Sequence, residues 1–404
     1  MDATTQTGDD LGMSRSVDQN TTLVKQCALD SGFDLVRITS AQEFSFDRQA
    51  ALTRLGDGLM DGLPWYTEGR IRRGSDPQQL LPGARSIISL GLSYFSATEK
   101  RPNDTGQTGK VARYALGKDY HRVMKARMKT YVQTLSSTLE TSIDARWYVD
   151  DGPMLDRAAA ARSGLGWFGK NTNILTPSHG SWVFLGQVVT DLDLVPDESL
   201  AKTCGNCVLC IEACPTDAIV EPFVIDNPRC ISHLTIENRG PIPIELRPQM
   251  EGWVFGCDIC QDVCPVNRKA IPAAVPIPPL SSQESPFDGE SPGLEESGLI
   301  DLMDALDMSE EDFQRRFRNS PIKRAKLVGL QRNACVALGN QADPVATPAL
   351  LRALASSQPL VRGHAAWALG NMEDMHAREG LEKALELEQD PWVREEIELA
   401  MNPG

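Results

Sequence analysis

The cysteines of this chain lie in two runs whose spacing suits the binding of iron–sulfur clusters. The first run, CGNCVLCIEACP, begins at Cys204 and has the pattern C-x₂-C-x₂-C-x₃-C-P. The second run, CDICQDVCP, begins at Cys257 and reads C-x₂-C-x₃-C-P, with Val254 where a further cysteine would complete the repeat. The complete pattern is the bacterial ferredoxin run, whose fourth cysteine binds the other cluster when two are present.

Applied to this chain, the ferredoxin pattern predicts two [4Fe–4S] clusters that share the two runs. The first cluster is expected to bind four thiolates, those of Cys204, Cys207, Cys210 and Cys264. The second receives three from the runs, those of Cys214, Cys257 and Cys260. Cys230 lies between the runs and is the predicted eighth ligand. A zinc ribbon or a structural disulfide pair is the alternative, although zinc ribbons usually lack the C-P endings.

The composition is that of an acidic globular protein. Charged residues make up 24%, hydrophobic residues 41%, and the net charge is −15. This charge argues against general nucleic-acid binding but leaves room for a local basic surface. Eight of the ten cysteines lie between 204 and 264, and the other two, Cys27 and Cys335, are expected to be small buried side chains. Residues 1–20 show no secretory signal and are interpreted as a mobile arm of a cytoplasmic protein without a membrane span.

The chain divides into several expected units, with a multidomain α/β plus α architecture. Residues 21–195 should form an α/β domain, because runs rich in β-branched residues alternate with runs of helical periodicity. Predicted strands lie within 33–38, 84–95, 147–150 and 182–194, and predicted helices within 21–32 and 121–140. The cysteine segment spans about 196–270. A connector rich in proline, serine and glycine follows over 271–300.

Residues 301–404 contain an internal repeat. RNACVALGN begins at Arg332, RGHAAWALGN begins thirty residues later at Arg362, and a weaker copy begins at Arg394. Paired helices at this period resemble HEAT-type repeats, which stack on a shared core. The stretch 314–332 has seven Lys or Arg residues and no acidic residue. A solvated face and an anionic ligand such as an RNA backbone both fit that charge.

Three further stretches carry a family resemblance. They are RYALGKDYH at 113–121, VDDGPMLDRAAAARSGLGWFGKN at 149–171 and SPIKRAKLVGLQRNACVALGN at 320–340. Together with the interrupted cysteine repeat, they resemble the epoxyqueuosine reductases, which are cobalamin-dependent iron–sulfur enzymes of tRNA queuosine synthesis. The resemblance covers nearly the whole chain after residue 20 and includes the order of the domains.

The resemblance implies both an architecture and a reaction. It implies a cobalamin-binding domain over 21–195, two clusters over 196–270, and HEAT-like repeats over 301–404 that help to hold the tRNA anticodon arm. The epoxide of epoxyqueuosine at the wobble position would be reduced to the alkene of queuosine with loss of water. This needs two protons and two electrons, which a donor of the flavodoxin or ferredoxin type would supply through the clusters. Cobalamin supplies chemistry that side chains cannot perform.

The proton donor of this family aligns with Asp150 in YVDDGP. Packing against the cofactor and an apolar substrate would disfavour its charged form, so that it keeps a proton to donate. The neighbouring Asp151 is the alternative donor. Both aspartates could instead be turn formers before Gly152-Pro153.

The same motifs imply further residues at the cofactor. Arg157 is expected to orient the substrate or the corrin amides. Cofactor contacts are expected from Tyr114, Asp119, Tyr120, His121, Asp150, Gly169, Lys170 and Asn171, with ordinary core packing or surface charge as the alternative. The pattern D-x-H-x-x-G, which places histidine on cobalt in some cobalamin proteins, is incomplete because Met124 stands where glycine would be. The expected cofactor is therefore base-off cobalamin without a histidine ligand.

Within the basic stretch, the resemblance implies tRNA contacts from Lys323, Arg324, Lys326 and Arg332 in a chain expected to act as a monomer. Three other interpretations remain. A corrinoid-dependent dehalogenase would have no use for the helical tail. A ferredoxin fused to an interaction tail would leave 149–171 unexplained. A tRNA-binding protein with purely structural clusters would hold them at inaccessible potentials.

Overall fold

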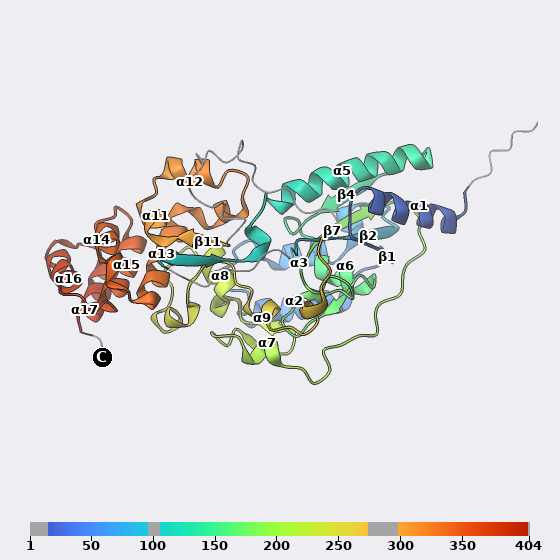
Figure 1. Ribbon diagram of the computed structural model, residues 1–404. Helices are drawn as coiled ribbons and strands as arrows, with labels where there is room; N and C mark the ends of the chain where they lie inside the picture. The colour runs from blue at the N-terminus through green and yellow to red at the C-terminus, as the bar shows by residue number, and fades with distance from the viewer. Residues whose placement is uncertain (1–14, 96–105, 274–297, 403–404) are drawn as a thin grey trace, which may run out of the picture.

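The computed structural model describes residues 15–95, 106–273 and 298–402. A domain built on a β-sheet lies at one end of an elongated molecule, and stacked helices form the other end (Figure 1). The short helices of the cysteine segment lie between them, along the lower edge in this view. The mixed α/β plus α fold class predicted from the sequence is confirmed.

The N-terminal sheet is antiparallel throughout. Its strand order is β1-β2-β7-β4, from Leu35–Ser40, Ser86–Ser93, Val183–Thr190 and Ala145–Tyr148. All residues of β2 are buried because helices cover both faces of the sheet. Ile88 and Leu90 pack in the same core as α1 (Val17–Asp30) and α5 (Tyr120–Leu139). The alternate residue Ile87 packs instead with α6 (Asp156–Arg162), as a two-residue period requires.

Helix α1 begins earlier than the sequence predicted. Ser16 accepts a hydrogen bond from the Gln19 backbone, and the Gln19 side chain accepts one from Ser16 N, forming a capping box. Residues 17–20 are therefore helical, which corrects the predicted arm. The rest of that arm, 1–14, lies outside the described residues. Cys27 and Cys335 are buried, as predicted.

Short elements connect the sheet to the cysteine segment. They are α2 (Ser45–Gly56), α3 (Glu68–Gly74), α4 (Pro77–Leu80), the 3-10 turn η1 (Arg113–Ala115), and a hairpin of β5 (Trp167–Phe168) and β6 (Ile174–Leu175). Three 3-10 turns lie in the cysteine segment after β9, namely η2 (Asn227–Arg229), η3 (Ile244–Leu246) and η4 (Pro248–Met250), and η5 (Asn267–Lys269) ends that segment.

Each cysteine run folds around a single helical turn. These turns are α7 (Leu209–Glu212) and α9 (Ile259–Asp262), and they pack against each other. Between the runs lie β8 (Ile219–Glu221), β9 (Val224–Ile225), α8 (Ile231–Ile236) and β10 (Trp253–Phe255). A three-stranded sheet, β10-β3-β11, then joins the three parts of the chain through β3 (Thr108–Val111) and β11 (Leu299–Asp301). The end of the predicted connector is thus a strand, and its residues 274–297 lie outside the described part.

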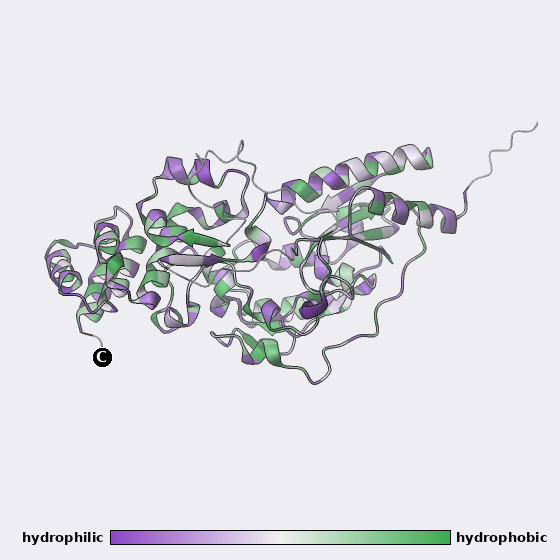
Figure 2. Ribbon diagram, in the orientation of Figure 1, coloured by the Kyte–Doolittle hydropathy of each residue, from purple (hydrophilic) through white to green (hydrophobic). Residues whose placement is uncertain are grey.

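The tail consists of helices in pairs. They are α11 (Leu302–Asp307), α12 (Glu310–Arg316), α13 (Lys326–Gln341), α14 (Thr347–Leu354), α15 (Pro359–Gly370), α16 (Met375–Leu387) and α17 (Pro391–Met401), with the turns η6 (Pro321–Ala325) and η7 (Pro344–Ala346). The three repeat copies lie on α13, α15 and α17, which stack in that order. Figure 2 shows hydrophobic and hydrophilic residues interspersed along these helices, as amphipathic packing requires.

Small residues let the repeat helices approach closely. A Cβ added at Gly339 would lie 2.9 Å from Ala368 Cα, and one added at Gly370 would lie 2.8 Å from Ala400 Cα. The tail is also fixed to the cysteine segment by a buried ion pair, because Arg247 binds both carboxylate oxygens of Glu396. Among the described helices, none has the length and apolar character needed to cross a membrane.

Candidate active site and cluster-binding segment

The eight cysteines of the segment lie close enough to one another for several of them to raise the pKa of their neighbours. Burial raises the pKa of the Cys210 thiol, and the neighbouring thiols of Cys204, Cys264 and Cys207 raise it further. Burial likewise raises the pKa of Cys264, with contributions from Cys204 and Cys207. These four residues form the outer group. Leu209, on the adjoining helical turn, is 40% exposed, and the residues flanking Cys204 are also exposed.

The inner group contains the cysteine that lies between the runs. Burial raises the pKa of Cys230, and the nearby Cys214 thiol adds to the effect. Burial raises the pKa of Cys260 and Cys257 far above the ordinary value, and Cys230 adds to both shifts. Cys230 therefore lies beside the three cysteines that needed a fourth partner. Cys210, which is assigned to the outer group, also raises the pKa of Cys260, so the division of the eight residues between two clusters stays a prediction.

Val254 shows why the repeat is interrupted. It is completely buried in β10, in the same core as Leu302. A Cβ on Gly109 of the neighbouring strand β3 would lie 2.7 Å from a Val254 methyl group. A side chain at position 254 therefore packs in the core against the three-stranded sheet and is not available to bind a cluster. Cys230, at the start of α8, lies near the inner group instead.

The arrangement fits two multi-iron clusters better than a zinc ion or disulfides. All ten cysteines have free thiols. Within the residues that the structure describes, no three His, Cys, Asp or Glu side chains converge closely enough to hold a single metal ion. A zinc ion needs its thiolates within about 2.3 Å of one centre, whereas a cluster holds them around a larger body. The buried thiols resist deprotonation alone, and iron would stabilise the thiolates.

Residues of the GKN motif hold the cysteine loops. The Lys170 ammonium group donates to the carbonyl of Gly205, over 2.8 Å, between two cysteines of the outer group. The buried Asn171 side chain donates to the carbonyl of Cys260, over 3.2 Å. At Gly169 a Cβ would lie 2.7 Å from Asn171 Oδ1. The structure therefore places the Lys170 and Asn171 side chains against the cysteine loops.

Asp150 and two aromatic residues of the predicted site, Tyr114 and Tyr120, do come together. The Tyr120 hydroxyl donates to Asp150 Oδ2 over 3.0 Å. The Tyr120 ring stacks on Phe184 and makes an edge contact with Tyr114. Burial, with the charge of Asp150, raises the pKa of both tyrosines well above the ordinary value. Both tyrosines therefore stay neutral, and Tyr120 can donate a hydrogen bond at any physiological pH.

The Asp150 backbone is unusual. Asp150 has φ = +56°, a left-handed conformation that is uncommon outside glycine. Its side chain is exposed, with one face open to solvent. Asp151 turns away and forms an ion pair with Lys125 on α5. The geometry thus separates the two adjacent carboxylates and gives the tyrosine hydrogen bond to Asp150.

The remaining residues of the predicted cofactor site surround this acid on different elements. Asp119 caps α5 and accepts a hydrogen bond from His121 N, and its carboxylate also contacts His121 Nδ1 over 2.7 Å. His121 stacks on Tyr120 with 4.0 Å between ring centroids. Arg157 is exposed and donates to Thr172 over 3.1 Å. Within the part of the chain that the structure describes, the Arg157 guanidinium forms no ion pair with a carboxylate.

The basic stretch contributes to a hollow next to this site. A pocket of about 430 Å³ is lined by Asp119, Arg122, Arg318, Asn319, Ser320 and Lys323. The backbone N–H of Asp119 donates to the carbonyl of Asn319 over 2.6 Å, which joins the start of α5 to the basic stretch. Arg122 could not be found from the sequence, because only the tertiary structure brings α5 to this stretch.

Two of the predicted tRNA residues already have partners, and one is inaccessible. Arg332 has no exposed surface, and its guanidinium donates to the carbonyls of Leu234, Asn238 and Gly240. The prediction that it contacts tRNA is wrong, because leaving these buried carbonyls unpaired would be costly. Arg324 forms a two-point ion pair with Glu237, while Lys326 is exposed.

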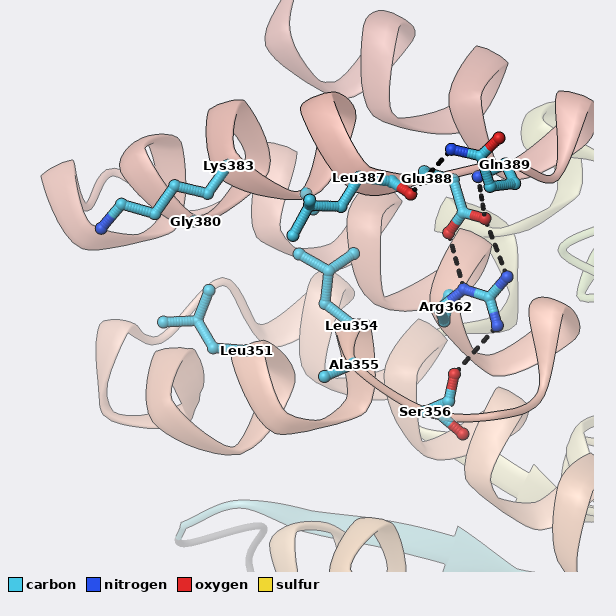
Figure 3. Close-up of a pocket in the computed structure, with 11 residues that line it drawn as sticks. Leu351, Leu354, Ala355, Ser356, Arg362, Gly380, Lys383, Leu387, Glu388 and Gln389 are labelled. Atoms are coloured by element: carbon cyan, nitrogen blue, oxygen red, sulfur yellow. Dashed lines mark hydrogen bonds and ion pairs between the residues drawn. The ribbon is translucent and has the colours of Figure 1, made fainter.

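A larger hollow lies far from the acid site, between α14 and α16 of the tail. It measures about 550 Å³ and is lined mainly by apolar side chains such as Leu351, Leu354 and Leu387 (Figure 3). Arg362 and Glu388 form a two-point ion pair at one end of it. This pair and the Arg362 bond to the Ser356 carbonyl connect neighbouring helices, so the repeat arginine serves the packing of the tail.

Comparisons with family models agree with the three parts of the fold. Residues 74–151 match the model described as "Epoxyqueuosine reductase QueG, DUF1730". Residues 203–267 match the "4Fe-4S double cluster binding domain", and residues 328–402 match "HEAT repeats". The predicted double-cluster segment and helical repeats are thereby confirmed.

Two relatives that align with most of this chain are both named epoxyqueuosine reductase. A protein of Gloeobacter violaceus named epoxyqueuosine reductase is 40% identical over 329 residues, 80% of this chain and 97% of that protein. The epoxyqueuosine reductase of Escherichia coli (strain K12) is 38% identical over 354 residues, 86% of this chain and 88% of that protein.

Solved structures agree as well. The epoxyqueuosine reductase of Bacillus subtilis superimposes with a TM-score of 0.85 at 32% identity, over 96% of this chain and 99% of that chain; its catalytic aspartate loop is swung out of the active site. An epoxyqueuosine reductase in complex with an epoxyqueuosine-modified stem loop of tRNA-Tyr gives 0.86 at the same identity and coverage. On identity, coverage and fold together, this chain belongs to the epoxyqueuosine reductase family.

Proposed function

We propose that this protein reduces the epoxide of epoxyqueuosine in tRNA to the alkene of queuosine. Two electrons and two protons are consumed, and the epoxide oxygen leaves as water. One observation supports this most directly, namely that the carboxyl group of Asp150 is oriented by Tyr120 in a chain that also carries a double-cluster cysteine segment. Asp150 is the proposed proton donor, because Asp151 is held by Lys125.

Cobalamin is the proposed cofactor at the acid site. When bound, it would supply the low-potential chemistry that breaks a carbon–oxygen bond. The open face of Asp150 and the aromatic wall of Tyr114 and Tyr120 fit a large planar ligand. His121 is the nearby histidine; its Nδ1 contacts Asp119 and its ring stacks on Tyr120. Arg157, which forms no ion pair with a carboxylate of the described residues, is available to bind an amide or the substrate.

The burial of the two cysteine groups suggests a direction for the electrons. Tyr94 is buried near both Cys260 of the inner group and Asp258, and Tyr114 lies near Asp258 and Asp150. The inner group is thus on the side of the acid site, and the outer group is on the surface. We propose that a small donor protein of the flavodoxin or ferredoxin type reduces the outer cluster first, and that electrons pass inward from there.

The basic hollow beside α5 is the proposed contact with the tRNA backbone. Arg122 and Arg318 are exposed, and Lys323 lines the same hollow, so three cations face a single acid, Asp119. A phosphate would balance this excess charge. Because Asp119 and Tyr120 are consecutive, a phosphate held here would bring a nearby nucleoside towards Asp150. Lys326 is a further exposed candidate, whereas Arg324 is engaged with Glu237.

One anaerobic experiment tests the proposal. The full chain is loaded with iron, sulfide and cobalamin and is then given a strong reductant and tRNA carrying epoxyqueuosine. The tRNA is digested, and the masses of its nucleosides are measured by mass spectrometry. The expected result is the loss of one oxygen atom from the modified base, only when cobalamin is present. An unchanged nucleoside in a protein that demonstrably binds cobalamin and both clusters would contradict the proposed substrate. Failure to bind cobalamin would contradict the proposed cofactor.

A further inference from the structure

The proposed reaction needs more protons than one carboxylic acid holds. Conversion of an epoxide to an alkene breaks both carbon–oxygen bonds, and the oxygen must receive two protons to leave as water. The clusters carry electrons only. Asp150 in its acid form can donate one proton, so each turnover requires that this residue be reprotonated or that a second source contribute. The reaction therefore requires a second source of protons near Asp150.

Asp156 is such a group, and the sequence motifs assigned it no role. It is the first residue of α6 and lies at the far end of the loop that begins at Asp150. Its Oδ1 atom is buried and has no hydrogen-bond partner in the described part of the chain. Its backbone carbonyl accepts a hydrogen bond from Gln187 of β7, which in turn is bonded to Ser89 of β2. The sheet thus holds Asp156 in place while one oxygen of its carboxyl group, Oδ1, remains without a hydrogen bond in the described part of the chain.

The surroundings of Asp156 favour its neutral form. Burial raises its pKa well above the ordinary value, and the charge of Asp150 raises it further, with a smaller contribution from Asp151. Its own backbone N–H and Arg157 oppose the shift without cancelling it. An unpaired buried carboxylate would be costly, whereas a carboxylic acid is tolerated. Two neighbouring carboxyl groups of unequal burial commonly differ in protonation in this way.

We propose that Asp156 is the proton reserve of the site and supplies the second proton through Asp150. In this step an O–H bond of Asp156 breaks and an O–H bond of Asp150 forms, with no electrons transferred; water relays the proton, because Asp156 Oδ1 makes no hydrogen bond within the described part of the chain. Asp150 then donates again to the departing oxygen. Asp156 does not touch the substrate, so it acts by recharging and positioning the acid that does. The inference rests on the proposed function, and it adds the source of the second proton.

Asp156→Asn tests this, because the amide preserves the shape and cannot release a proton. The full chain with both clusters and cobalamin is compared with Asp156→Glu, which keeps the acid, and with Asp151→Asn as the matched control. The turnover number of Asp156→Asn should fall on the order of 100-fold, a typical effect of losing a positioned acid. Asp156→Glu and Asp151→Asn should stay near the wild-type rate.

Buffer dependence distinguishes proton supply from a structural role. In Asp156→Asn the rate should rise with the concentration of a small buffer acid such as imidazolium, whereas the wild-type rate should not. A wild-type rate and pH profile in Asp156→Asn would overturn the proposal. A loss of cobalamin affinity, titrated by absorbance, without buffer rescue would also overturn it and would make Asp156 a cofactor ligand.

One readout does not depend on turnover. Infrared spectra of the holoprotein at neutral pH should contain the band of a buried protonated carboxyl group that is missing in Asp156→Asn and present in Asp151→Asn. If wild type shows this band but never converts the modified tRNA, the proposed substrate fails while the protonated acid stands. If wild type turns over and the band is absent, the proton reserve is wrong.

Discussion

The Tyr120 hydroxyl donates a hydrogen bond to Asp150 Oδ2 across 3.0 Å, and this bond fixes the orientation of the proposed acid. Tyr120 is itself held by stacking on Phe184, with 4.2 Å between ring centroids and an interplanar angle of 6°. The position of the Asp150 carboxyl group therefore depends on Tyr120, which is packed in the core of the sheet domain. Asp151, one residue later, is tied to Lys125 on the outside of α5.

Replacing Asp150 by asparagine should abolish proton donation while keeping the site intact. The amide oxygen can still accept the Tyr120 hydrogen bond, so cobalamin and iron contents should not change. We expect the turnover number to fall by a factor on the order of 10²–10⁴. Turnover is measured by mass analysis of nucleosides from the modified tRNA. Asp151→Asn is the control, and if it alone lost activity, the two roles would be exchanged.

Replacing Cys230 by alanine should remove one cluster and spare the other. The inner group would retain three thiolates, while the outer group does not use Cys230. Iron content should fall by about half, since the two clusters are of one type. Cys27→Ala is the matched control, because it removes a buried thiol outside the cluster segment. Full iron content in the Cys230 variant would reject its assignment as a ligand.

Replacing Arg318 and Lys323 together by glutamine should weaken tRNA binding and reduce its dependence on salt. Each lost phosphate contact lowers the slope of log K against log salt by about 0.7–0.9. Filter binding over a range of salt concentrations gives this slope, with Lys383→Gln and Arg378→Gln on α16 as a double control of equal charge. An unchanged slope would show that the hollow beside α5 is only solvated. Weaker cobalamin binding would indicate instead that the hollow holds the phosphodiester of the cofactor.

Arg332→Gln should destabilise the fold and leave the affinity of the remaining folded protein for tRNA unchanged. The substitution removes the guanidinium that pairs with three backbone carbonyls at the seam between α8 and α13. The expected cost is about 3 kcal/mol, since buried acceptors lose their partners. Urea unfolding followed by circular dichroism measures it. A normal unfolding midpoint with weak tRNA binding would restore Arg332 as a contact.

The tail should lose stability in acid because of one ion pair. The Arg362 hydrogen bond holds the pKa of Glu388 at about 2, below its ordinary value of 4.5. A carboxyl group whose pKa is lower in the folded state stabilises the fold above its unfolded pKa. That contribution is lost as the pH falls from about 4.5 towards 2. Thermal unfolding between pH 7 and pH 3 should show the loss in wild type.

The Glu388→Gln variant should have a lower Tm than wild type at pH 7 and a smaller further decrease in acid. Glu386→Gln is the control, because Glu386 is exposed near the end of α16, two residues before Glu388, and forms no ion pair with the residues that the structure describes. Equal pH dependence in wild type and Glu388→Gln would show that other carboxylates govern the acid transition.

The sequence by itself determined the features that are encoded locally. Ligand spacing within a cysteine run depends on the few residues between the cysteines, so both clusters could be predicted. The repeat helices followed from periodicity, and Asp150 followed from a contiguous motif. Counting the cysteines even pointed to Cys230. Only the boundary of α1 was misplaced among these local features, because the capping box at Ser16 was not considered.

Only the tertiary structure decided which charged and polar side chains are accessible and what they contact. Arg332 and Lys323 lie in the same basic stretch, yet one is buried against carbonyls of the cysteine segment and the other lines an open hollow. Lys170 and Asn171 contact cysteine loops, and Arg122 joins residues almost two hundred positions away. Burial and partners of a charge depend on segments that meet only on folding, and the same is true of the buried Asp156 Oδ1 atom.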